Sequence, residues 1–153
     1  MPLARVSTVV PGSVHDAEAV WYDTAGWSRW VVGLARVESV SGRWPAVGGQ
    51  VLWESGPAGR GRVTERVLSH EPLSGQAVEV DDDSIRGTQT VSFAPEDDSV
   101  IVTLSLAYEL KRRSPLMRLV DLLFIRRAMT RSLQDTLSRF GFELEAARRP
   151  DVG

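Results

Sequence analysis

The chain has 153 residues, of which 42% are hydrophobic, and this size and apolar content predict one domain with its own core. The formal net charge of −2 and the sequence pI of about 5.7 argue against nucleic-acid binding, which needs a basic field. Without cysteine, the chain can form no disulfide, thiolate nucleophile or cysteine-ligated zinc site. No apolar signal region follows the amino terminus and no run approaches the ~20 apolar residues that span a bilayer, so we expect a cytoplasmic protein.

Charge is distributed unevenly along the chain. Residues 1–110 contain 8 basic and 15 acidic side chains, whereas residues 111–149 contain 10 basic and 4 acidic ones. We therefore expect the carboxy-terminal quarter to be a positive block on an otherwise acidic protein.

The amino-terminal part predicts one strand and two short helices. The strand covers residues 3–10, LARVSTVV, and ends at the turn PGS. Ser13 is placed to cap a helix over residues 15–22, and a second helical segment is expected over residues 24–32. The stretch 19–30, AVWYDTAGWSRW, contains three of the five tryptophans. We expect its first half to pack the helix against a sheet.

Six further segments have the β-branched content and the flanking turns of antiparallel strands. They cover residues 35–41, 50–55, 61–69, 76–80, 85–93 and 99–110. The connections between them are short, polar or rich in glycine and proline, as hairpins require. In the last strand the even positions from Val100 to Leu110 are apolar apart from Tyr108, so one face of that strand is expected to be buried.

A long helix is predicted after the segment KRRSP, with Ser114 as its N-cap and Pro115 in its first turn. Its apolar residues recur at three-four spacing and predict one buried stripe: Leu119, Leu122, Met129, Leu133, Leu137, Phe140 and Leu144. A different face carries a four-residue ladder of Arg127, Arg131, Asp135 and Arg139. Residues 149–153 are expected to be a disordered tail.

This order of elements predicts an α+β protein in which a curved seven-stranded antiparallel sheet wraps around the long carboxy-terminal helix. Because a twisted sheet curves, a helix across its concave side can leave a cavity beneath it. The segments AEAVWYDTAGWSRWVVGLARVES and VGGQVLWE resemble the helix-grip superfamily, which includes START-related lipid-transfer domains and bacterial polyketide cyclases and dehydrases. The resemblance implies one ligand-binding domain over residues 1–148. It also implies a hydrophobic, lipid or polyketide-like ligand.

The expected lining of that cavity comes from the inward positions of the strands and the helix: Trp30, Trp53, Val63, Glu65, Val67, Gln89, Val91, Phe93, Leu104, Leu106, Tyr108, Met129 and Leu133. Trp30 can serve either as core packing or as a wall at the cavity rim. Glu65 shares a face with Val63 and Val67, where loss of water favours the protonated form of a carboxyl and suits it to bind a ligand or act as an acid. The alternative is that Glu65 pairs with an arginine near a strand edge.

Three functions stay open at this point. The first is binding of a hydrophobic small molecule, and the second is cyclisation or dehydration of a polyketide-like substrate, with Glu65 or Tyr108 as acid or base. The third is docking on a membrane surface or a second copy through the apolar, arginine-flanked segment 116–125, which begins with Leu116 and ends with Ile125. His15 and His70 are expected outside the cavity in surface or capping roles. Neither a metal nor a cofactor is expected.

Overall fold

The computed structural model describes residues 3–56, 61–111, 116 and 124–148. Strand β1 (Leu3–Pro11) is followed by helix α1 (Val14–Tyr22), the 3-10 turn η1 (Thr24–Gly26) and the short helix α2 (Trp27–Trp30). The remaining elements are β2 (Leu34–Ser41), β3 (Gln50–Ser55), β4 (Arg62–Glu71), β5 (Gly75–Asp81), β6 (Ile85–Glu96), β7 (Ser99–Leu110) and α4 (Arg126–Arg148). The observed strands agree with the predicted ones to within three residues at each end.

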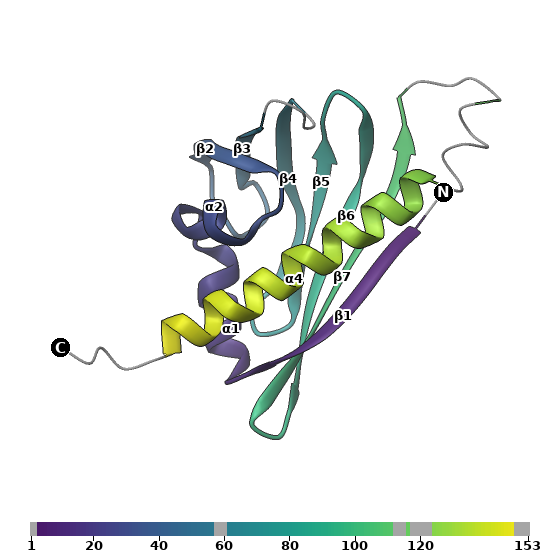
Figure 1. Ribbon diagram of the computed structural model, residues 1–153. Coiled ribbons are helices and arrows are strands. Elements are labelled where there is room, and N and C mark those ends of the chain that lie inside the picture. Colours follow the sequence, from purple (N-terminus) through teal and green to yellow (C-terminus); the bar gives the residue numbers. More distant parts are fainter. Residues whose placement is uncertain (1–2, 57–60, 112–115, 117–123, 149–153) are drawn as a thin grey trace.

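The strands form one antiparallel sheet in the order β1-β7-β6-β5-β4-β3-β2, so β1 and β2 are its two edges. Helix α4 runs diagonally across one face of the curved sheet, and α1 and α2 pack beside it toward β2 (Figure 1). This is the predicted helix-grip fold, which is confirmed. The buried even positions of β7, from Val100 to Tyr108, face α4 and form the floor of the core.

The amino-terminal helices follow from local capping. The Ser13 hydroxyl accepts a hydrogen bond from the Asp16 N–H at 3.1 Å, and the Asp16 carboxylate accepts one from the Ser13 N–H at 3.5 Å. The carboxylate of Asp23 then caps η1 through the Ala25 N–H at 3.2 Å. The second predicted helix is divided in the structure into η1 and the single turn α2, and α2 ends where the backbone turns to an extended conformation at Val31.

Helix α4 buries part of the stripe predicted for it. Leu133, Leu137, Phe140 and Leu144 are buried, Thr136 joins them, and Met129 is half-buried against the core. The predicted cap at Ser114 and Pro115, the stripe residues Leu119 and Leu122, most of the segment 116–125 and the tail 149–153 lie outside the described residues.

Glycine in the middle of α4 provides a stability prediction. Gly141 is flanked by helix on both sides, and a Cβ at this position would lie 3.5 Å from Val10 Cγ1, an ordinary van der Waals contact. Because glycine is about 1 kcal/mol less favourable than alanine inside a helix, Gly141→Ala should stabilise the fold by about that amount. The melting temperature should rise by about 2–4 °C.

The matched control is Gly87→Ala in β6. A Cβ at Gly87 would collide with the carbonyl oxygen of Ala107 in the neighbouring strand, so the same substitution should lower the melting temperature. A Gly141→Ala variant that melts no higher than the wild type would contradict the packing seen between α4 and β1.

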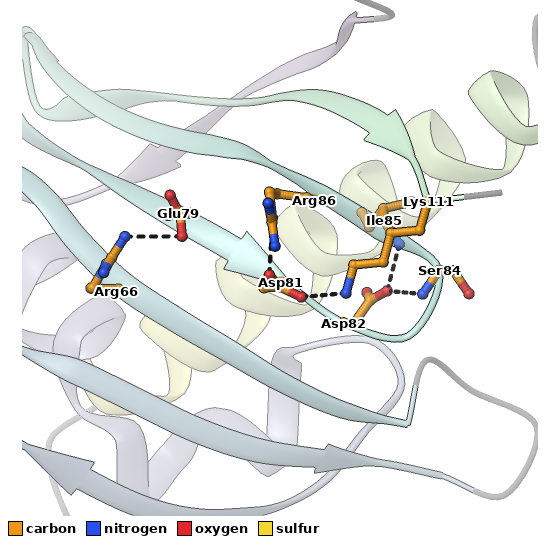
Figure 2. Close-up of polar contacts among 8 residues, drawn as sticks. All are labelled: Arg66, Glu79, Asp81, Asp82, Ser84, Ile85, Arg86 and Lys111. Atoms are coloured by element: carbon orange, nitrogen blue, oxygen red, sulfur yellow. Dashed lines mark hydrogen bonds and ion pairs between the residues drawn. The ribbon is translucent and has the colours of Figure 1, made fainter. Parts of the chain in front are cut away.

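The face of the sheet turned away from α4 carries ion pairs across neighbouring strands (Figure 2). Arg66 lies 3.0 Å from Glu79, and Asp81 contacts both Arg86 at 3.1 Å and Lys111 at 2.5 Å. Hydrogen bonds from Lys111 and then from Arg86 hold the pKa of the Asp81 carboxyl below its ordinary value. This charged face is therefore solvated and distinct from the apolar face that α4 covers.

The lowered pKa of Asp81 predicts a small dependence of stability on pH. A carboxyl with a depressed pKa in the folded state stabilises the fold above its ordinary pKa of 3.8, and this contribution disappears as the pH falls through the lowered value. Asp81→Asn should therefore destabilise the protein by at most ~1 kcal/mol at neutral pH, as for other exposed pairs. Urea unfolding at several pH values should show the difference between Asp81→Asn and the wild type vanish in acid. A difference that persists well below pH 3.8 would contradict the assignment.

Candidate functional site

A small pocket lies between the inner face of the sheet, the aromatic amino-terminal segment and α4. Its lining residues are Trp21, Trp27, Trp30, Val31, Val32, Trp53, Glu65, Val80, Gln89, Leu104, Ser132, Leu133 and Thr136. Its volume is about 50 Å³. Typical pockets for drug-sized ligands have roughly 300–1,000 Å³. In this conformation the space beneath α4 is therefore filled mostly by side chains, with room for a few water molecules at most.

The tryptophans of the amino-terminal segment form one wall of the pocket. The ring of Trp30 lies 4.8 Å from that of Trp21 and 5.2 Å from that of Phe140, measured between centroids. The Trp27 indole N–H donates to the Trp21 carbonyl at 2.8 Å, which ties α2 to the end of α1. Trp30 is only 1% exposed, so it is part of the core as well as a wall of the pocket.

The indole N–H of Trp30 is buried and has no hydrogen-bond partner among the described residues. A buried donor without a partner is uncommon in native proteins and costs roughly 1–3 kcal/mol. A ligand or a water molecule with an oxygen in this pocket would remove that penalty. Because the Trp30 side chain also lines the pocket, we expect its N–H to favour a bound group that accepts a hydrogen bond.

Glu65 lines the pocket from the middle of β4. Its side chain is 8% exposed, and the indole N–H of Trp53 on β3 donates to its Oε2 at 2.7 Å. The strands place the two residues together because Trp53 pairs with Val63 and Val51 pairs with Glu65, so both side chains point toward α4. The structure thus places the Glu65 carboxyl on the wall of a pocket that is otherwise lined by aromatic, aliphatic and neutral polar side chains.

The two other polar candidates, Gln89 and Tyr108, lie at different places in the structure. Gln89 on β6 lines the pocket with Glu65, whereas Tyr108 on β7 is fully buried behind it and pairs with Gly87. The structure therefore brings two members of the expected polar trio to the pocket and leaves the third in the core.

Of the remaining residues expected to line the cavity, some line the pocket and others are packed in the core. Trp53, Leu104 and Leu133 line the pocket, whereas the others are packed into the core or against it without lining it: Val63, Val67, Val91, Phe93, Leu106 and Met129. Seven lining residues are absent from the expected lining: Trp21, Trp27, Val31, Val32, Val80, Ser132 and Thr136. Thr136 lies within the helical spacing of the buried stripe, which is the signal that identifies it, and its hydroxyl accepts a hydrogen bond from the Val32 N–H at 3.1 Å.

A β-bulge places His70 on the inner side of β4, where the simple alternation did not predict it. The pairing of β4 with β5 shifts between Val67 and Ser69, so that His70 lies opposite the buried Gln76. The His70 ring packs perpendicular to Tyr22 at 5.3 Å, and burial, followed by the charge of Glu18, raises the pKa of Tyr22. This second aromatic cluster contributes to packing at the end of α1, outside the pocket.

Neither a metal site nor a membrane span is evident in the described part of the chain. No group of three or more histidine, aspartate or glutamate side chains there is arranged to hold a metal ion. Among the described helices, none is both long and apolar enough to cross a membrane.

Comparison with known proteins gives a family match over nearly the whole chain. The sequence profile of the family described as "Polyketide cyclase / dehydrase and lipid transport" matches residues 1–145. No functionally curated protein matches the sequence closely enough to count as a relative.

Solved structures with this fold are similar in shape but distant in sequence. A protein from Thermus thermophilus is 20% identical, with a TM-score of 0.77 over 97% of this chain and 100% of that chain. A START superfamily protein from Mycobacterium smegmatis is 14% identical, with a TM-score of 0.76 over 95% and 98%. Norcoclaurine synthase from Thalictrum flavum, in complex with dopamine and hydroxybenzaldehyde, is 14% identical, with a TM-score of 0.70 over 97% and 88%. At these identities the likeness extends to the fold alone.

Proposed function

The chain belongs to the polyketide cyclase/dehydrase and lipid-transport family, and from this premise we propose that it binds a hydrophobic small molecule between the curved sheet and α4. The single observation that carries the proposal is the composition of the pocket. Four tryptophans and the buried Glu65 line it, and one of these tryptophans, Trp30, has an indole N–H without a partner among the described residues. Such a lining combines a large apolar contact area with a few polar groups that orient a ligand.

The small volume of the pocket means that binding requires an opening movement. Besides the packing of Trp30 against Phe140, two polar contacts hold the α2 segment against α4: the hydrogen bond from the Val32 N–H to Thr136, and the ion pair between Arg29 and Glu143 at 2.6 Å. Both are single interactions: the hydrogen bond is partly buried, and the ion pair is largely exposed on its arginine side, where such pairs contribute little. We expect a ligand to enter where α2 separates from α4. The contacts between these two helices therefore lie at the entrance of the pocket.

The test is saturable quenching of tryptophan fluorescence. The protein is titrated with oleic acid, with a hydroxylated anthraquinone and with anilinonaphthalene sulfonate, because these probes represent a lipid chain, a flat polyketide-like ring and a general apolar ligand. Trp30→Phe removes the unpartnered N–H while keeping an aromatic ring, so it should weaken binding of a ligand that accepts a hydrogen bond there. Trp44→Phe is the matched control, since Trp44 does not line the pocket and its indole N–H donates to the Tyr22 carbonyl. Absence of saturable quenching with all three probes would refute the proposal.

We infer an enzyme acting on a polyketide-like ligand as the second candidate, because Glu65 is a buried carboxylate on the pocket wall. In that function Glu65 would act as the acid or base, and Tyr108 would support the core behind it. Binding without turnover is separated from catalysis by incubating the protein with a linear polyketone and analysing the products by mass spectrometry. Loss of one water from the substrate, dependent on Glu65, would favour the enzyme.

A further inference from the structure

The outward side of α4 differs from the surface expected of a helix that only covers a sheet. Phe142 is 73% exposed and Phe124, two residues before the helix begins, is 69% exposed. These are two of the four phenylalanines of the chain. At 1.5 Å per residue they lie roughly 27 Å apart along the helix direction. Two exposed aromatic rings, one within α4 and one just before it, form a pattern that needs an explanation.

Four arginines lie between the two phenylalanines in the sequence, and three of them project from the outward side of α4. Arg127, Arg131 and Arg139 are exposed, and none of them forms an ion pair with an acidic side chain within the described residues. They belong to the side of α4 opposite the buried Leu133 and Leu137. Asp135 lies among them and the exposed Glu145 lies one turn beyond Phe142. Three arginines against these two acidic side chains leave a net charge of about +1 on this surface, on a protein that is acidic overall.

We propose that this surface, consisting of Phe124, Arg127, Arg131, Arg139 and Phe142, docks on an anionic lipid membrane with α4 lying parallel to it. Aromatic rings that enter the interface, flanked by arginines that bind lipid phosphates and carboxylates, are the composition of an interfacial helix. Of the elements that the structure describes, no other covers this side of α4, which faces the viewer in Figure 1. The proposal goes beyond ligand binding, since it concerns the opposite side of the helix from the pocket.

Two other occupants fit this surface less well. A second copy of the chain, related by two-fold symmetry, would bring the same three arginines against one another. A nucleic acid would satisfy the arginines but would offer no apolar layer to the two phenylalanines, which lie at opposite ends of the surface. An anionic bilayer satisfies both kinds of side chain at once.

Docking would also bring the pocket close to the membrane. Ser132, Leu133 and Thr136 line the pocket from α4, and they alternate along the helix with the arginines of the docking surface. The same helix therefore has one side on the pocket and the other available to lipid. A hydrophobic ligand that leaves a bilayer would have a short path to the α2–α4 contacts described above.

The experiment is sedimentation of the full chain with vesicles of phosphatidylcholine, alone or mixed with phosphatidylserine, at low and high salt. Wild-type protein should bind the anionic vesicles at low salt and be released at high salt. Replacing Arg127, Arg131 and Arg139 by serine should weaken binding roughly one-hundred-fold, at about five-fold for each arginine. The double variant Phe124→Ser and Phe142→Ser should weaken binding at least about ten-fold.

The control is the double variant Arg5→Ser and Val9→Ser on the outer side of β1, which removes one exposed arginine and one exposed apolar side chain elsewhere. It should bind like the wild type, and circular dichroism should show that every variant is folded. The proposal is overturned if anionic vesicles do not bind at low salt, if neutral vesicles bind equally well, or if the control is as weak as the arginine variant. It is also overturned if the surface instead supports a dimer or binds a DNA duplex independently of the two phenylalanines.

Discussion

Phe140→Ala should destabilise the protein by about 3–5 kcal/mol, which is the usual result of removing a buried phenylalanine side chain. Phe140 is fully buried on α4, and its ring meets those of Trp21 at 5.0 Å and Trp30 at 5.2 Å. The change therefore removes the contact through which the helix holds the aromatic wall of the pocket. Since domains of this size unfold with about 5–15 kcal/mol, a large share of the stability would be lost.

Phe142→Ala is the matched control, because it removes the same side chain two residues further along the same helix. Phe142 is 73% exposed, so this change should alter the free energy of unfolding by no more than about 0.5 kcal/mol. Urea unfolding of the two variants measures the difference directly. Equal losses at the two positions would show that α4 does not present the face to the sheet that the structure describes.

The alternation of apolar and polar residues predicted the fold because successive side chains of a strand point to opposite faces, so the apolar positions identify the buried face. The even positions of β7 and the stripe of α4 are apolar in the sequence apart from Tyr108. Of these the structure buries Val100 to Tyr108 on β7 and, within the described part of the helix, Leu133, Leu137, Phe140 and Leu144. The fold class, the succession of strands along the chain and the long covering helix could therefore be predicted from the spacing of apolar residues and the residue types of the turns.

The lining of the pocket could be predicted only in part, because alternation gives the face of a residue but not its depth beneath the helix. Gln89 and Tyr108 both point inward, yet only Gln89 reaches the pocket, since the tryptophans from α1 and α2 decide where space is left. His70 was missed for a different reason. The β-bulge between Val67 and Ser69 changes the phase of β4, and no sequence pattern in this segment marks it.

Glu65→Gln should separate the chemical role of the buried carboxylate from its structural role. Glutamine has nearly the same shape, and its amide oxygen can still accept the hydrogen bond that the Trp53 indole N–H donates to Oε2. The fold should therefore persist. Hydrogen bonds to a charged group contribute about 1.5–3 kcal/mol. A hydroxylated ligand that donates to the carboxylate should bind roughly 10- to 100-fold more weakly to the variant.

Two comparisons are needed to interpret this result. Oleic acid is the control ligand, and Glu54→Gln is the control variant. Glu54 precedes Ser55 on β3 but faces outward, where it pairs with Arg36, so its replacement should leave all ligand binding unchanged. Oleic acid has no hydroxyl along its chain, and its affinity should fall much less in Glu65→Gln than that of the hydroxylated anthraquinone. Equal weakening of both ligands would mean that Glu65 shapes the pocket without contacting the ligand. If Glu65→Gln binds the anthraquinone normally but no longer converts a polyketone, the carboxylate acts in catalysis and not in recognition.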